Sequence, residues 1–301
     1  MSAHPDNPMH DALPRFPAPP AGGLDESMQR AFDEAGVIIL DGFVSREACA
    51  RLKASAEALI DAFDPAEHAS VFSTTSNAQH ADRYFTESGD KIRFFFEDGA
   101  FDEQGRLRQA RRDSLNKIGH AMHDLDPAFD AFSRTPELAA AAASLGLADA
   151  VIIQSMYILK PPRIGGEVVC HQDSTYIYTE PETCTGFWFA LEDATVENGC
   201  MHFIPGEHRG PLKARHRRQA DGQLRTEVLD DTPWPMERVR AAEAPAGSLV
   251  IFCGRAPHMS GPNRSSRSRH AYTLHAIDRR SNYPADNWLQ RDPSLPLRGF
   301  T

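Results

Sequence analysis

The stretch AVIIQSMYILKPPRIGGEVVCHQDSTYIYTEPETCTGFWFALE, residues 150–192, places three β-like runs one after another. The runs 150–159, 168–178 and 185–192 are rich in β-branched and aromatic residues, and turn-forming pieces such as PPRIGGE separate them. Further runs of this kind follow at 200–204, 225–229, 248–253 and 269–278. Many short strands at this spacing predict an antiparallel sandwich or barrel of the jelly-roll kind, a mainly β fold.

The chain before this β-rich part predicts helices around a short buried strand. A helix should begin after Asp25 and stop at Gly36, a strand should follow at 37–40, and Ser45 should cap a helix that reaches Phe63. Other expected elements are a strand at 91–96 and helices at 114–124 and 136–145. We expect these helices to pack on the β-rich half, so that 24–301 form one domain. A separate helical N-terminal domain is the less favoured alternative.

Composition limits the possible classes of protein. Residues 1–23 hold six prolines and predict a disordered leader. The net charge of −10 argues against nucleic acid or an anionic membrane as the main partner. No apolar run is long enough for a membrane span, and the N-terminus lacks the pattern of a secretory signal. Five scattered cysteines predict a reducing, cytoplasmic location without a disulfide framework, whereas the oligomeric state is left open.

His171 and Asp173 lie two residues apart in one of the β-like runs. A strand would point both side chains to one face and Gln172 to the other. The pair is either an exposed polar edge or two of three metal ligands. His258 follows a buried strand and a turn, where it can face the pair and supply the third ligand. Two imidazoles and one carboxylate hold Fe(II) with three open positions, although such sets also bind Zn(II).

Arg269 comes eleven residues after His258, at the start of the next predicted strand. A guanidinium can form a bidentate bond with a carboxylate, as the far end of 2-oxoglutarate would require beside an open iron site. The hydroxyl of Ser260 could add a donor there. The alternative for Arg269 is a solvated charge at a strand end.

Several motifs together resemble the phytanoyl-CoA dioxygenase family of Fe(II)/2-oxoglutarate oxygenases, most of all its phytanoyl-CoA dioxygenase domain-containing protein branch. They are His171-Gln-Asp173, GFWFALEDATVENGCMHFIPGEHRG (186–210) and HMSGPNRSSRSRHAYTLH (258–275), with further likeness at 89–105, 114–127 and 144–162. The resemblance spans roughly 25–280. It implies a double-stranded β-helix, that is, a jelly roll with helices buttressing one sheet.

The resemblance also implies roles for single residues. His171, Asp173 and His258 match the family's iron ligands, and Lys117 matches a lysine that contacts 2-oxoglutarate. Other positions that match the lining of the co-substrate pocket are Met156, Trp188, Ser260 and Arg269. From the residues alone, Lys117 would be a helix-surface charge, and Met156 and Trp188 would be core residues. The implied cofactor and co-substrates are Fe(II), 2-oxoglutarate and O2.

The implied activity is a dioxygenase that decarboxylates 2-oxoglutarate to succinate and CO2 and hydroxylates a C–H bond of a small organic substrate. The sequence does not reveal that substrate. Segment 211–245 departs from the family pattern and is expected to border the substrate mouth, as are residues 176–178. A CoA thioester would need a phosphate site, for which the candidates are Lys213, Arg215, Arg217 and Arg218, or these form a solvated loop. Two other classes remain open: a cupin-like metalloenzyme that does not use 2-oxoglutarate, and a non-catalytic binding scaffold.

Overall fold

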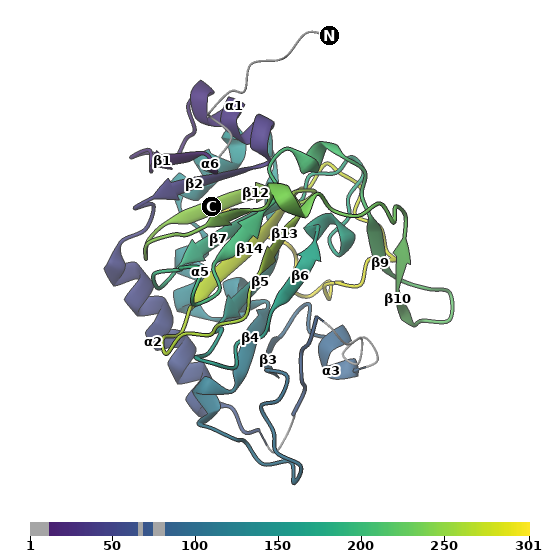
Figure 1. Ribbon diagram of the computed structural model, residues 1–301. Helices are drawn as coiled ribbons and strands as arrows, with labels where there is room; N and C mark the ends of the chain where they lie inside the picture. Colours follow the sequence, from purple (N-terminus) through teal and green to yellow (C-terminus); the bar gives the residue numbers. More distant parts are fainter. Residues whose placement is uncertain (1–11, 66–68, 75–81) are drawn as a thin grey trace.

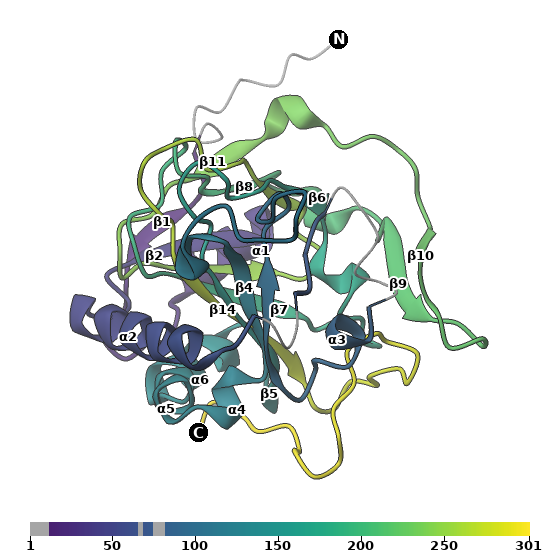
Figure 2. The ribbon, with the colours of Figure 1, turned by 90° about the horizontal axis from the view of Figure 1, so that it is seen from below.

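The computed structural model describes residues 12–65, 69–74 and 82–301. Its described part has three layers, with helices on one face of a large sheet and a small sheet on the other (Figure 1). Figure 2 shows α2, α5 and α6 on one side of the molecule and the β9–β10 hairpin on the opposite side. The predicted β-sandwich with helices against one sheet is therefore confirmed.

The strands form three sheets. The large sheet has the order β1 (Arg15–Pro17), β2 (Val37–Asp41), β12 (Leu249–Cys253), β7 (Thr185–Ala190), β14 (Ala271–Asp278), β5 (Ala150–Ile158), β4 (Leu115–His120) and β3 (Ile92–Phe96). The small sheet has the order β11 (Arg240–Ala242), β8 (Met201–Phe203), β13 (His258–Ser260) and β6 (Val168–His171). A separate hairpin joins β9 (Ala214–Arg218) and β10 (Leu224–Val228).

The helices are α1 (Glu26–Ala35), α2 (Arg46–Ala62), α3 (Arg83–Thr86), α4 (Met122–Leu125), α5 (Pro127–Ser133) and α6 (Pro136–Ser144). The expected caps of the first two helices are confirmed: Asp25 accepts hydrogen bonds from the N–H groups of Ser27 and Met28, and Ser45 accepts one from Ala48. Gly36 ends α1 in the left-handed region, with φ of 76°. In the part of the chain that the structure describes, no helix has the length and apolar character that crossing a membrane requires.

Alternation along the central strands separates two cores. On β2, Ile38 and Leu40 pack with the helices, whereas Val37 and Ile39 face the space between the two sheets. On β7, Phe189 faces the helices and Trp188 faces the small sheet. Because side chains of a strand alternate between faces, a continuous apolar run can fill both cores at once. The polar site described below lies in the layer between the sheets.

Three local predictions are wrong. The segment 114–124 was expected to be a helix, yet it forms β4 followed by the short α4, because β4 pairs on both sides within the large sheet. Residues 12–23 do not belong to a disordered leader, since β1 pairs in parallel with β2 and Leu13 is buried; residues 1–11 lie outside the described residues. The run 168–178 is a strand only through His171, after which Asp173–Thr175 form a 3-10 turn.

Candidate metal centre and its cavity

A cavity of about 420 Å³ opens between the two sheets. The large sheet contributes lining residues from β4, β5, β7 and β14, and the small sheet contributes others from β6 and β13. All eight site residues predicted from the sequence line this cavity: Lys117, Met156, His171, Asp173, Trp188, His258, Ser260 and Arg269. The structure thus brings together residues that lie up to 152 positions apart in the chain.

His171, Asp173 and His258 form a compact cluster at one wall of the cavity. Their nearest ligand-type atoms all lie within 4.8 Å of one another. Oδ1 of Asp173 is 3.5 Å from Nε2 of His171 and 3.6 Å from Nε2 of His258. His171 ends β6 and pairs directly with His258 at the start of β13, while the 3-10 turn brings Asp173 beside them. The sequence suggested that His171 and Asp173 share one face of a single strand. In the structure, two neighbouring strands and the 3-10 turn bring the three residues together.

The two histidines have the same hydrogen-bond arrangement. Nδ1 of His171 donates to the carbonyl of Val169 at 2.8 Å, and Nδ1 of His258 donates to the carbonyl of Ala256 at 3.0 Å. With the proton held on Nδ1, the lone pair of each neutral ring is on Nε2, which faces the carboxylate. This is how proteins fix the tautomer of metal-ligating histidines, so the cluster fits a divalent metal.

The local electrostatics favour the protonation states that bind a metal. Burial and the neighbouring His171 lower the pKa of His258 to about 4, so its imidazole is neutral near pH 7. Burial raises the pKa of Asp173, but His275, His258 and His171 outweigh it and hold the pKa well below the usual range. A neutral imidazole next to a carboxylate is the donor set expected for a non-haem iron site.

His275 is a site residue that the sequence reasoning missed. It lies on β14, is buried, and its Nε2 donates to Oδ2 of Asp173 at 2.8 Å. Asp173 therefore offers one oxygen to the cluster while the other is held. A signal was available, because Thr273 and His275 alternate with Tyr272 and Leu274 on an otherwise apolar strand and so share one face.

Arg269 and Ser260 lie on a second part of the cavity wall. Arg269 is 2% exposed, its Nε donates to the carbonyl of Gly199 at 3.1 Å, and Nη1 has no hydrogen-bond partner among the described residues. Its guanidinium lies 5.4 Å from the centre of the Trp188 ring. Burial lowers its pKa to about 10, so Arg269 still carries its charge at neutral pH. The alternative of a solvated strand-end charge is wrong.

Lys117 lies on β4 and points into the cavity, so it is not a helix-surface charge. Its Nζ is 3.3 Å from the centre of the Phe72 ring, and the rings of Phe85 and Phe95 lie further out. Burial lowers the pKa of Lys117 to about 7, while Glu97 acts in the opposite direction. A cation surrounded by aromatic faces, with no ion pair to a carboxylate among the described residues, suits an anionic ligand in the cavity.

Lys160 and Glu97 are two further charged lining residues without a sequence signal of their own. Lys160 is 3% exposed and donates to the hydroxyl of Ser260 at 3.0 Å and to the carbonyl of Gly166 at 2.7 Å. Glu97 is 2% exposed, accepts from the N–H of Gly166, and burial raises its pKa. With Lys117 and Arg269, this side of the cavity gathers three buried cations and one carboxylate.

The other end of the cavity is aromatic and mostly uncharged. Tyr176 and Ile177 line it, as do His216 of β9 and Thr226 of β10, so the segment 211–245 borders the cavity at the β9–β10 hairpin. Trp288 from the C-terminal segment completes this wall. Tyr178 is not among the lining residues; its ring instead lies under the guanidinium of Arg215 at 3.9 Å.

The basic run of the hairpin already has partners. Lys213 pairs with Asp230, Arg215 with Asp286, and Arg217 with both Glu227 and Asp286. Arg218 donates to the carbonyl of Gly222. None of these four residues lines the cavity. The geometry therefore favours a paired surface hairpin over a phosphate site.

Comparison with known proteins agrees with this site. The model of the family described as phytanoyl-CoA dioxygenase matches residues 32–271. Phytanoyl-CoA dioxygenase 1 of Oryza sativa subsp. japonica is 43% identical over 282 residues, which cover 93% of this chain and 99% of the rice protein. Phytanoyl-CoA dioxygenase domain-containing protein 1 of Bos taurus is 41% identical over 291 residues, covering 91% of this chain and 97% of the bovine protein.

Solved structures share the fold at lower identity. The non-heme alpha ketoglutarate dependent carbocyclase SnoK from nogalamycin biosynthesis matches with a TM-score of 0.62 at 18% identity, covering 94% of this chain and 99% of its own. EvdO2 from Micromonospora carbonacea var. aurantiaca, complexed with 2-oxoglutarate, matches with a TM-score of 0.56 at 24% identity, covering 90% and 98%. The predicted jelly-roll fold is therefore confirmed.

Proposed function

The chain belongs to the phytanoyl-CoA dioxygenase family, and from this premise we propose that it hydroxylates a C–H bond of a small, largely uncharged organic substrate. It is a 2-oxoglutarate-dependent non-haem iron oxygenase, with Fe(II) as cofactor and 2-oxoglutarate and O2 as co-substrates. The observation that carries the proposal is the convergence of Nε2 of His171, Nε2 of His258 and Oδ1 of Asp173 at the wall of a cavity that also holds buried cations.

His171, Asp173 and His258 would hold the iron. The backbone carbonyls of Val169 and Ala256 keep both imidazoles in the ligating tautomer, and His275 fixes the rotation of the Asp173 carboxylate. When Fe(II) is bound, the chemistry it supplies is O2 activation coupled to decarboxylation of 2-oxoglutarate to succinate and CO2. The chain itself would orient the co-substrate and the substrate.

The co-substrate would lie between the triad and the buried cations. Arg269 would take the far carboxylate of 2-oxoglutarate through its free guanidinium edge, with Ser260 as a second donor. Lys117 would add positive charge, and Met156 and Trp188 would pack against the carbon chain. A dianion suits this wall because, among the residues that the structure describes, Arg269, Lys160 and Lys117 form no ion pair with a carboxylate.

The substrate would occupy the aromatic end of the cavity. Phe72, Tyr176, Ile177 and Trp288 line that end, and Nζ of Lys117 lies 3.3 Å from the centre of the Phe72 ring. Because the basic hairpin run is paired, we do not propose a CoA thioester as substrate. Related folds act on other bonds, as the carbocyclase SnoK shows, so cyclisation is the reaction that a product analysis must distinguish from hydroxylation.

The binding experiment uses anaerobic titration of the protein with Mn(II) and then 2-oxoglutarate. We expect the wild-type protein to bind both. Arg269→Ala should keep Mn(II) binding but weaken 2-oxoglutarate binding by about tenfold or more, since a hydrogen bond to a charged group is worth ~1.5–3 kcal/mol. Exposed Arg30 offers a matched control as Arg30→Ala.

The outcomes separate the three classes left open by the sequence. Loss of 2-oxoglutarate affinity in Arg269→Ala alone supports the proposal. Metal binding without any 2-oxoglutarate binding would favour a cupin-like metalloenzyme of another kind, and no metal binding would favour a scaffold. A screen of uncharged candidates for succinate formation above background would then identify the substrate. The cytoplasmic location stays a prediction.

A further inference from the structure

Lys160 has a strained backbone, and its side chain lies in a narrow space lined by glycines. Its backbone has φ of 38°, in the left-handed region that residues with a side chain rarely adopt. Its carbonyl accepts hydrogen bonds from Nδ2 of Asn263 at 2.9 Å and from the N–H of Arg269 at 3.3 Å. A strained residue persists only where its surroundings hold it, and such positions gather at functional sites.

Two glycines clear the path of the Lys160 side chain. A Cβ atom at Gly165 would lie 2.8 Å from Cγ of Lys160, and a Cβ at Gly199 would collide with Cε. The carbonyl of Gly199 also accepts the hydrogen bond from Nε of Arg269. The same glycine therefore positions the two cations next to each other.

The ammonium group of Lys160 fixes the hydroxyl of Ser260. In its protonated form Lys160 has three N–H donors and no acceptor, so its ammonium group donates to Oγ of Ser260. The hydrogen of Ser260 then points elsewhere, and both residues line the cavity. Among the residues that the structure describes, two acceptors serve Nζ of Lys160, and its third N–H has none.

We propose that Lys160 is a positioning residue for the co-substrate, which turns the Ser260 hydroxyl into a donor to the far carboxylate of 2-oxoglutarate and places a second positive charge beside that of Arg269. This inference rests on the proposed function. Lys117 packs among aromatic rings, whereas Lys160 belongs to the part of the wall formed by Ser260, Gly199 and Arg269, so the two lysines make different contacts.

The experiment measures binding to the Mn(II)-loaded protein without oxygen, for wild type, Lys160→Met, Ser260→Ala and the double variant. Methionine keeps an unbranched stem in the glycine-lined slot but cannot donate. The two ligands are 2-oxoglutarate and 2-oxobutanoate, which has the same oxo-acid head but ends in a methyl group. Exposed Lys91, changed to methionine, is the matched control.

We expect Lys160→Met to weaken 2-oxoglutarate binding about tenfold or more and to leave 2-oxobutanoate and Mn(II) binding unchanged. The loss should be smaller when Ser260 is already alanine, because the lysine acts through that hydroxyl. If Lys160→Met does not fold, Lys160→Leu, which likewise cannot donate, serves with the same ligand pair.

Three results would overturn the inference. Unchanged 2-oxoglutarate affinity in Lys160→Met would remove any role, equal weakening of both ligands would make the lysine merely structural, and strict additivity with Ser260→Ala would exclude action through the hydroxyl. Failure of the proposed function looks different, because the wild-type protein itself would then not bind 2-oxoglutarate.

Discussion

Asp173 uses its two carboxylate oxygens differently. Oδ1 faces Nε2 of His171 and of His258, while Oδ2 accepts a hydrogen bond from His275. The sequence could identify Asp173 because His-x-Asp is a recognisable spacing. For His275 the sequence offered only its alternation with apolar neighbours, and for Lys160 it offered nothing, because their contacts span 102 and 100 positions of chain and form only on folding.

Replacing His275 tests whether the hydrogen bond to Oδ2 keeps the Asp173 carboxylate in its orientation. His275→Ala removes the N–H that holds Oδ2, so the carboxylate can rotate away from the triad. We expect metal affinity to fall about 10- to 100-fold while the protein stays folded. Isothermal titration with Mn(II) measures this, and His202→Ala is the control, since that partly buried imidazole lies outside the cavity lining. Equal affinities in both variants would show that Asp173 is held by other means.

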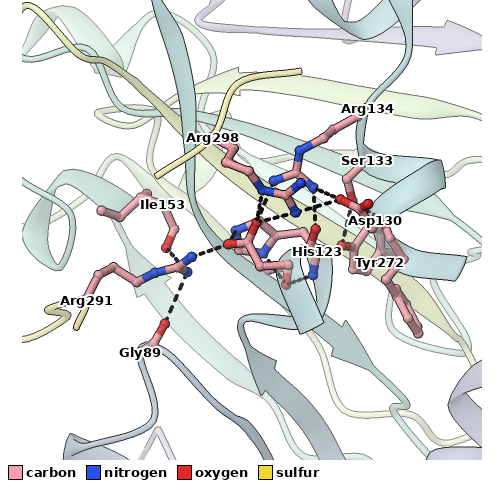
Figure 3. Close-up of polar contacts among 12 residues, drawn as sticks. Gly89, His123, Asp130, Ser133, Arg134, Ile153, Tyr272, Arg291 and Arg298 are labelled. Carbon is pink, nitrogen blue, oxygen red and sulfur yellow. Dashed lines mark hydrogen bonds and ion pairs between the residues drawn. The ribbon is translucent and has the colours of Figure 1, made fainter. Parts of the chain in front are cut away.

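At the level of elements, a buried carboxylate ties the C-terminal segment to the helical layer. Asp124 of α4 has a fully buried side chain, and it pairs with His123, Arg134, Arg291 and Arg298. Figure 3 shows these four partners gathered in one place. The segment that carries Arg291 and Arg298 also carries Trp288, which lines the cavity. Although burial raises the pKa of Asp124, the His123 hydrogen bond and the arginine charges hold it well below the usual range.

Breaking this cluster should destabilise the fold. Asp124→Asn leaves three arginines short of a buried anion, and we expect the free energy of unfolding to fall by about 3–5 kcal/mol. Asp130→Asn is the matched control: Asp130 pairs with Arg134 and Arg298, but its side chain is 38% exposed, so its loss should cost about 1 kcal/mol or less. Urea unfolding of both variants measures the difference. Similar losses in the two would argue against Asp124 as the anchor.

The element level also shows where sequence patterns failed. The caps of α1 and α2 are local hydrogen bonds, so Asp25 and Ser45 predicted them correctly. The segment 114–124 looked helical, but β4 takes its conformation from β3 and β5 on either side. Propensity is a weak guide where long-range pairing decides. For the same reason, the residue pattern alone predicted Lys117 to be a helix-surface charge, whereas in the structure it lies on β4 and lines the cavity.

Across the whole molecule, neutral histidines lie in the buried layers. Burial lowers the pKa of His120 well below its ordinary value, and it also lowers the pKa of His123 and His270. The sign follows directly: above the unfolded value of about 6.5 neither state is protonated, and below it only the unfolded chain takes up the proton. Stability therefore falls as the pH falls from about 6.5 towards the folded pKa values.

His120 offers the clearest test of this acid sensitivity. Its Nδ1 donates to the Ser88 hydroxyl, which itself donates to the carbonyl of Phe85, so asparagine can preserve the donor without titrating. We expect His120→Asn to lose stability less steeply than wild type below about pH 6.5, by up to about 1.4 kcal/mol per pH unit. Urea unfolding at several pH values measures both slopes, with His202→Asn as control. Parallel slopes for wild type and His120→Asn would contradict this account.

The sandwich itself could be predicted because short apolar runs and turns recur through the second half of the chain. The strand order could not, since β2 from the N-terminal part enters the large sheet beside β12, more than 200 residues later. The same closure brings β6, β13 and β14 around one cavity. Single candidate ligands can be recognised in the sequence. Which of them lie together depends on how the strands pair in the folded sheets.

The central claim is that His171, Asp173 and His258 hold the iron that turns over 2-oxoglutarate. Its most direct test is the rate of succinate formation from 2-oxoglutarate in air, with Fe(II) and without added substrate, for wild type, His171→Ala, Asp173→Ala and the surface control Asp149→Ala. We predict iron-dependent turnover in wild type and Asp149→Ala, and only the iron-free background in the two triad variants. Wild-type rates in either triad variant, or turnover that does not depend on iron, would contradict the account.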